Sequence, residues 1–167
     1  MNNDYFNHYE GYDLGWFKDF VDDFNTHYVP TFTGITDLGL FSDIDLICQY
    51  NGKPYGVELK TRLKTYNDGY FIEPKKLNDM RKFTTVSGIP CYYVNLIEPT
   101  HTIAIWRFDD INKNRDNIIK TKVKIKNKGR ECEEIVDRYI LPLWMASTYN
   151  MTSHLFTPTC LKRTLTQ

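Results

Sequence analysis

The sequence predicts an α/β fold in which helices flank a mixed central sheet. Three patterns support this class: an amphipathic helix near the N-terminus, a tight β-hairpin after it, and a second helix that leads into an apolar strand. Helices that alternate with strands cover the faces of a sheet, and a parallel pair of strands needs a right-handed crossover. With 167 residues, 41% hydrophobic and 25% charged, we expect one domain over 1–167, with a core over about 15–108 and a C-terminal elaboration over 109–167.

The first helix is predicted over residues 15–27. Apolar residues recur there at the spacing i, i+3, i+4 and i+7, which places them on one face of a helix. These residues are Phe17, Phe20, Val21 and Phe24. Pro30 prevents the helix from continuing, because proline has no amide hydrogen to donate. Residues 31–40 then predict a loop or a short irregular strand.

A β-hairpin is the clearest element in the chain. Residues 43–50 and 53–60 both have the composition of strands, and they flank Asn51-Gly52. This dipeptide is preferred in two-residue type I′ turns. A turn of known length determines which positions of the two strands face each other.

The hairpin register brings acidic side chains together. It places Asp45 opposite Glu58 and Asp43 opposite Lys60, with paired Cβ atoms roughly 4.5–5.5 Å apart. Asp43 and Lys60 could form an ordinary cross-strand ion pair, whereas two facing carboxylates repel each other. A divalent cation removes that repulsion, and oxygen ligands suit Mg²⁺. The pair therefore predicts a metal site.

The elements after the hairpin are a helix and several strands. Residues 73–87 predict the second helix, with a proline in its first turn and apolar residues at helical spacing. Residues 91–97 predict an interior strand, and residues 102–108 predict another. Lysine alternates with β-branched residues over 119–126, while 133–149 mix helical and extended signals.

Charge is distributed unevenly along the chain, although the net charge is zero. Residues 1–67 contain ten acids and five bases, and residues 68–167 contain eleven acids and sixteen bases. This asymmetry fits an acidic site that faces a basic contact surface, and it fits chance clustering of solvated charge equally well. No secretory signal and no apolar run of membrane-spanning length is present, so we expect a cytoplasmic, reducing setting without membrane contact.

The sequences D-I-D-L and V-E-L-K in the two hairpin strands resemble the motif of the PD-(D/E)XK nuclease superfamily, whose members include restriction endonucleases and Holliday junction resolvases. The resemblance covers roughly residues 15–108 and implies an αβββαβ core. It further implies that Asp45 and Glu58 bind the metal ion and that Lys60 positions the nucleophile. The carbonyl oxygen of Leu59 would be the backbone ligand of the metal.

Several positions of the motif stay open. No proline precedes the motif Asp, because Ile44 stands there, so Asp43 remains an alternative metal ligand. The superfamily's helix after the third strand often supplies a Lys or Gln to the site. Lys76 is the nearest match, although a solvated helix lysine is an ordinary alternative. The first helix of the superfamily often adds an acid, for which Asp19 and Asp22 are candidates.

Basic residues are the expected contacts to a nucleic acid. Arg62 could bind a phosphate or could be an exposed arginine at the end of a strand. Lys122 and Lys124 share one face of the predicted strand with Lys120 and Lys126. These lysines could follow a phosphate backbone, but protection of an edge strand from aggregation is the favoured interpretation.

These features predict a Mg²⁺-dependent deoxyribonuclease in which a metal-activated water attacks the phosphodiester and Mn²⁺ can replace Mg²⁺. The expected partner is a nucleic acid, DNA rather than RNA, and a homodimer is compatible with this function. The chain length fits a resolvase-like, repair-type or phage-encoded nuclease, by analogy alone. The alternatives are a non-catalytic nucleic-acid-binding or phage assembly protein that retains the fold, and a nuclease directed at RNA.

Overall fold

The computed structural model describes residues 4–39, 42–126 and 133–159. Its α-helices are α1 (Asp4–His27), α2 (Pro74–Ser87) and α3 (Phe108–Lys113). Short 3₁₀ turns lie at Glu98–Thr100, Arg115–Asn117 and Leu143–Met145. The strands are β1 (Phe32–Asp37), β2 (Leu46–Tyr50), β3 (Lys53–Arg62), β4 (Tyr70–Ile72), β5 (Cys91–Ile97), β6 (Thr102–Arg107), β7 (Ile119–Lys126), β8 (Glu133–Leu141), β9 (Ser147–Asn150) and β10 (Leu155–Thr157).

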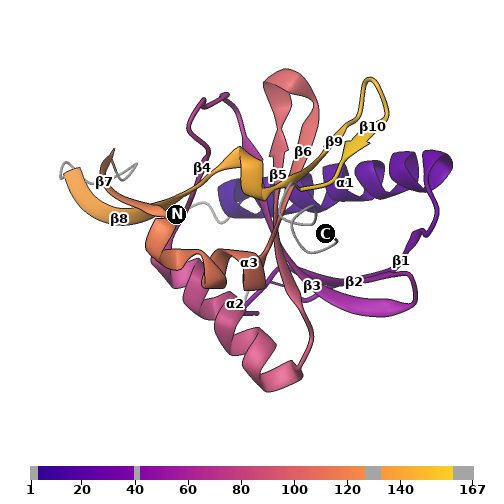
Figure 1. The fold of residues 1–167 in the computed structure, drawn as a ribbon, viewed down its shortest axis with the longest axis horizontal. Helices are drawn as coiled ribbons and strands as arrows, with labels where there is room; N and C mark the ends of the chain where they lie inside the picture. The colour runs from indigo at the N-terminus through magenta and orange to yellow at the C-terminus, as the bar shows by residue number, and fades with distance from the viewer. Residues whose placement is uncertain (1–3, 40–41, 127–132, 160–167) are drawn as a thin grey trace, which may run out of the picture.

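A seven-stranded mixed sheet in the order β1-β2-β3-β5-β6-β9-β10 forms the centre of the fold. Among the described strands of this sheet, only β3 and β5 run parallel, and α2 makes the crossover between them. The order α1, β1, β2, β3, α2, β5 is the predicted αβββαβ core, with β4 inserted before α2. α1 packs on one face of the sheet, and α2 and α3 pack on the other (Figure 1). The predicted fold class is therefore confirmed.

The predicted hairpin forms β2 and β3. Asn51 and Gly52 both have positive φ angles, 53° and 71°, as a type I′ turn requires. The strand pairing ends at Leu46 and Val57. β2 therefore begins three residues later than predicted, because residues 42–45 form bends instead of continuing the ladder.

α1 begins at Asp4, well before the predicted start at residue 15. Gly11 and Gly15 weaken the helical pattern there, because glycine lowers helix propensity by about 1 kcal/mol. Packing against the sheet stabilises the helix: Phe20 and Phe24 are 1% and 4% exposed. Each such buried Phe contributes about 1.5–3 kcal/mol. No helix within the described residues is long and apolar enough to cross a membrane.

The second half of the chain supplies strands to two sheets. β9 and β10 extend the main sheet beyond β6. β7 and β8 pair with β4 in a separate three-stranded sheet, which curves away from the main sheet in Figure 1. The mixed signals over residues 133–149 resolve into two strands with a 3₁₀ turn between them.

Alternation along β3 decides which side chains face which helix layer. Val57 and Leu59 belong to the apolar cluster that packs under α1. Glu58 lies between them and points to the opposite face, where it meets Lys76 of α2. An acidic side chain is thus placed at a buried position next to the apolar core.

Candidate metal and catalytic site

Glu58 is a buried acid whose carboxylate is only partly hydrogen-bonded by the described residues. Its side chain is 5% exposed, and its Oε1 lies 2.6 Å from Nζ of Lys76. Its Oε2 is buried without a hydrogen-bond partner among the described residues. Burial, and then the charge of Asp45, raise the pKa of Glu58 to about 7, against the opposing effect of Lys76. When Glu58 is ionised, one of its two carboxylate oxygens therefore has no hydrogen-bond donor among the described residues.

Asp45 lies just before β2 and turns its carboxylate toward β3. Its Oδ2 accepts a hydrogen bond of 2.6 Å from the backbone N–H of Leu59. Its own N–H donates to the carbonyl of Val57 at 3.1 Å. Burial raises the pKa of Asp45, with a smaller opposing effect of the Leu59 N–H. The ladder ends before the expected Asp45–Glu58 pair, yet the charge of Asp45 still acts on Glu58 and raises its pKa.

Two lysines approach these acids from different elements. Lys60 is exposed, and strand alternation places it on the same side of β3 as Glu58. Its charge lowers the pKa of both Asp45 and Glu58. Lys76 lies in the first turn of α2; burial lowers its pKa, but the charge and hydrogen bond of Glu58 outweigh burial, so the net shift is upward. Lys76 thus stays protonated beside Glu58.

The acid that α1 brings to the site is Asp13. Asp19 and Asp22, the candidates expected from the sequence, are both exposed on α1. Asp13 is half-buried, accepts a hydrogen bond from the hydroxyl of Thr61, and raises the pKa of Asp45. It escaped prediction because the helix was expected to begin two residues later. Its position four residues before Phe17 continues the apolar stripe by one turn, which was the available signal.

Asp43 points away from the motif lysine. Its carboxylate forms an ion pair of 2.9 Å with Lys82 of α2. The expected Asp43–Lys60 pair is therefore wrong, because the pairing of β2 with β3 ends at Leu46 and Asp43 lies outside it. This ion pair makes Asp43 a weaker candidate than Asp45 for binding a metal.

Arg62 points into the protein. Its Nε donates to Oδ1 of the buried Asn95 at 2.6 Å, and its Nη2 donates to the hydroxyl of Tyr93 at 2.6 Å and to the carbonyl of Phe71. The guanidinium thereby links β3, β4 and β5. The expectation of an exposed strand-end arginine is wrong, because these buried acceptors hold the side chain. A contact of Arg62 with phosphate stays a prediction.

The lysine-rich strand is β7, as expected. Lys122 is exposed, and Lys120 forms an ion pair of 3.2 Å with Asp137 of β8. Lys124 belongs to β7, but its side chain lies outside the described part of the structure. The pairing of β7 with β8 alone in the described sheet leaves it at an edge.

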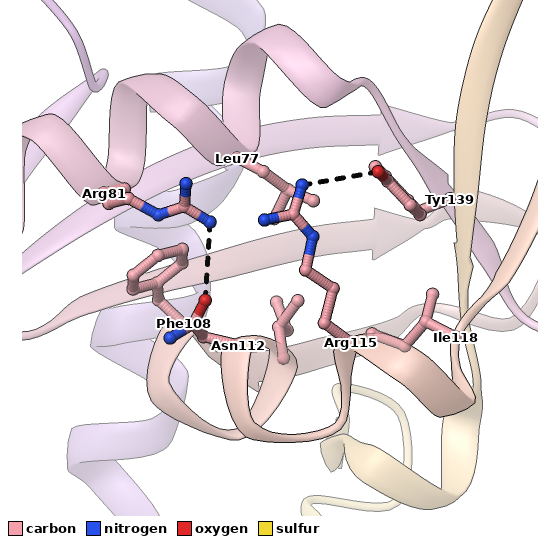
Figure 2. Close-up of a pocket in the computed structure, with 8 residues that line it drawn as sticks. Leu77, Arg81, Phe108, Asn112, Arg115, Ile118 and Tyr139 are labelled. Carbon is pink, nitrogen blue, oxygen red and sulfur yellow. Dashed lines mark hydrogen bonds between the residues drawn. The ribbon is translucent and has the colours of Figure 1, made fainter.

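A shallow pocket lies elsewhere, between α2, α3 and β8 (Figure 2). Arg81 donates to Asn112 and Arg115 donates to Tyr139, each at 3.4 Å. Neither guanidinium has an ion-pair partner among the residues that the structure describes. The pocket contains none of the predicted site residues. Its apolar lining consists of Leu77, Phe108, Ile111 and Ile118.

The acidic cluster has the donor set of a hard-cation site. Asp45 and Glu58 offer oxygen atoms only, which Mg²⁺ and Mn²⁺ prefer, whereas the ligand atoms of Asp13, Asp45 and Glu58 do not all lie within 4.8 Å of one another. The buried, unpartnered Oε2 of Glu58 is an acceptor that a cation would satisfy. The residues present therefore fit a divalent metal ion.

No family model and no curated protein matches the chain in sequence. Among solved structures, the chain is similar to Hjc, a Holliday junction resolvase from the archaeal hyperthermophile Archaeoglobus fulgidus. The two share 7% sequence identity with a TM-score of 0.41, over 65% of this chain and 75% of Hjc. A likeness of this size carries no argument about activity, so the functional assignment depends on the residues described above.

Proposed function

We propose that this protein is a metal-dependent nuclease that hydrolyses phosphodiester bonds of DNA. The observation that carries the proposal is the buried Oε2 of Glu58, unpartnered among the described residues and close to the carboxylate of Asp45. A buried carboxylate oxygen without a donor costs free energy, and a second carboxylate nearby adds repulsion. A divalent cation bound between the two acids removes both costs.

Asp45 and Glu58 would hold this ion, with the carbonyl of Leu59 as a further ligand, and Asp13 would add negative charge beside Asp45. Mg²⁺, or Mn²⁺ in its place, supplies a water of lowered pKa and an electrophilic contact for the scissile phosphate when bound. Asp45 is already oriented, because the Leu59 N–H fixes its Oδ2. Because this hydrogen bond fixes the orientation of the carboxylate, it also fixes the position of Oδ1, the oxygen that would bind the ion.

The two lysines have different tasks in this proposal. Lys60 is exposed beside the acids, where its ammonium can position the attacking water or stabilise charge on the phosphate. Lys76 binds Oε1 of Glu58 at 2.6 Å and leaves Oε2 for the metal. Lys76 is therefore a positioning residue, while Lys60 is the catalytic lysine.

A nucleic-acid substrate is supported by cations outside the acidic cluster that have no ion-pair partner among the described residues, and DNA is the polymer that the motif resemblance implies. Arg81 and Arg115 face one pocket without an ion-pair partner in the described chain, and Lys122 is exposed on β7. Each can neutralise a backbone phosphate, and such contacts supply affinity without sequence preference. The same contacts would fit RNA, so the polymer is decided by experiment.

A second candidate is a nucleic-acid-binding protein that does not cleave. The Lys76–Glu58 ion pair favours it, because this pair partly compensates the buried acid without a metal. It leaves Oε2 of Glu58 unsatisfied, which is why the nuclease is preferred.

Cleavage of labelled single-stranded, duplex and branched DNA, and of RNA, tests the proposal. Reactions run with Mg²⁺, with Mn²⁺ and with a chelator, and with Glu58→Gln and Asp43→Asn proteins. We expect metal-dependent cleavage that Glu58→Gln abolishes and Asp43→Asn, the acid paired with Lys82, retains. Binding of DNA without any metal-dependent cleavage would replace the nuclease by the binding protein.

A further inference from the structure

A second group of side chains with metal-ligand atoms lies at the C-terminal end of α1. Asp23 and His27 belong to the last turns of this helix, and His154 lies in the turn between β9 and β10. One ligand atom of each lies within 4.8 Å of the others. Asp23 is ten residues from Asp13, which is about 15 Å along a helix at 1.5 Å per residue. The two sites are therefore separate.

The two imidazole rings direct the same nitrogen toward Asp23. The rings stack with centroids 4.0 Å apart and planes 12° apart. Nδ1 of His154 lies 3.0 Å from Oδ2 of Asp23. Nδ1 of His27 lies 2.8 Å from the backbone oxygen of Asp23 and 4.0 Å from its Oδ1. The carbonyl oxygen of Asp23 can only accept, so Nδ1 of His27 donates to it here, and a metal ion bound at this nitrogen would replace that hydrogen bond.

The surroundings hold these ligands in place. Tyr149 donates its hydroxyl to Oδ2 of Asp23 at 2.5 Å, as an outer-shell partner of a ligating carboxylate does. His154 has a φ of 56°, a region that non-glycine residues adopt at a cost. Asn150 fixes the turn, because its Oδ1 accepts from the N–H groups of Thr152 and Ser153. The ring of His154 is thus presented by a constrained turn.

We propose that Asp23, His27 and His154 bind a divalent transition-metal ion, with Zn²⁺ as the representative. Imidazole nitrogen suits Zn²⁺, Co²⁺ and Ni²⁺, whereas Mg²⁺ prefers the oxygen-only cluster near β3. The ion replaces the proton that now joins His154 to Asp23. Side-chain exposures of 24–42% leave room for water as the remaining ligand. The bound ion joins the end of α1 to the β9–β10 turn.

Calorimetry with Zn²⁺ and the absorption spectrum of the Co²⁺ form test this site directly. The full-length protein is compared with His27→Gln, His154→Gln and, as a matched control, His101→Gln, an exposed histidine that also has a positive φ. We expect Zn²⁺ affinity to fall at least about tenfold in each ligand variant, the lower end of the loss from outer-shell changes alone. The control keeps the affinity of the wild type.

The Glu58→Gln protein separates this site from the proposed nuclease centre. It should retain Zn²⁺ binding at Asp23, His27 and His154 whether or not the wild type cleaves DNA, because this site does not include Glu58. Histidine NMR signals of the wild type, shifted by one equivalent of Zn²⁺, report the ligands even if a variant fails to fold. Zn²⁺ that does not bind the wild type near pH 7, or that binds all three histidine variants equally, would overturn the proposal and leave a hydrogen-bonded tie between α1 and the turn.

Discussion

Asp23, in the last turns of α1, and Glu58, on β3, are carboxylates that the protein treats in opposite ways. Asp23 is 24% exposed and accepts hydrogen bonds from Tyr149 and His154. Burial raises its pKa, but these hydrogen bonds and the nearby histidines outweigh burial, so the pKa is lowered overall. Glu58 is 5% exposed with one oxygen unpartnered in the described chain, and burial and Asp45 raise its pKa to about 7. The difference lies in the donors that the fold provides to each carboxylate, and it supports the proposal that Glu58 binds a cation.

The largest expected effect tests whether the Glu58 cluster is catalytic. Lys60→Ala should reduce single-turnover cleavage at saturating enzyme at least about a hundredfold, because it removes a group that acts on the transition state. DNA affinity and Mg²⁺ binding should remain, since Lys60 is exposed and binds neither acid directly in the hydrogen-bond pattern of the described residues. Lys64→Ala, an exposed lysine four residues on, is the control. Equal rates for Lys60→Ala and wild type would exclude a catalytic role for Lys60.

The pH dependence of the free energy of unfolding should distinguish Glu58 from Asp23. The pKa of Glu58 rises from 4.5 to about 7 on folding, so its carboxyl adds stability that is full below pH 4.5 and is lost as pH rises to about 7. The loss is at most about 3 kcal/mol without metal. Asp23 has a lowered pKa and acts in the other direction, with stability lost as pH falls below the unfolded value.

Urea unfolding with a chelator between pH 4 and pH 8 measures this difference. Glu58→Gln should flatten the decline toward pH 7, and Asp23→Asn should flatten the decline at acidic pH. Mg²⁺ should restore wild-type stability near pH 7, because the cation favours the ionised form of Glu58. An unchanged profile in Glu58→Gln would show that this acid is already satisfied by Lys76.

Mg²⁺ should distinguish Asp45 from its neighbour Asp43. Asp45→Asn should weaken Mg²⁺ binding at least about tenfold, the lower end for outer-shell losses, while Asp43→Asn should leave it unchanged because Asp43 pairs with Lys82. Isothermal calorimetry or Mg²⁺-dependent melting measures both. Equal losses in the two variants would place the metal nearer to the start of the bend than we propose.

The smallest expected effect concerns the basic residues outside both acid clusters. Arg81→Ala and Arg115→Ala should each weaken DNA binding severalfold and reduce its salt slope by about 1, the value for one phosphate contact. The rate of the chemical step should not change. Arg107→Ala, whose guanidinium lies 3.7 Å from Asp109, is the control. Salt slopes equal to wild type in both pocket variants would remove this pocket from the nucleic-acid surface.

Elements with a local signature were predicted well. The predicted strand 91–97 begins and ends at the observed residues of β5, and the Asn51-Gly52 turn has the expected geometry. α2 starts one residue from its predicted position. Each depends on the spacing of neighbouring side chains or on the φ preferences of a dipeptide. Glu58 and Lys60 share one side of β3 for the same reason, since alternation is a property of any strand.

Contacts between distant segments were not readable from spacing. Tertiary packing determines three polar contacts of this kind, which are Asp13 with Thr61, Asp43 with Lys82 and Arg62 with Asn95. Asp23 and His154 are 131 positions apart and meet because β9 and β10 extend the sheet over the end of α1. Local periodicity therefore accounts for the strands, the helices and the motif spacing. Long-range packing decides which charged groups are buried and which of them obtain hydrogen-bond donors, because burial and pairing depend on elements far apart in the chain.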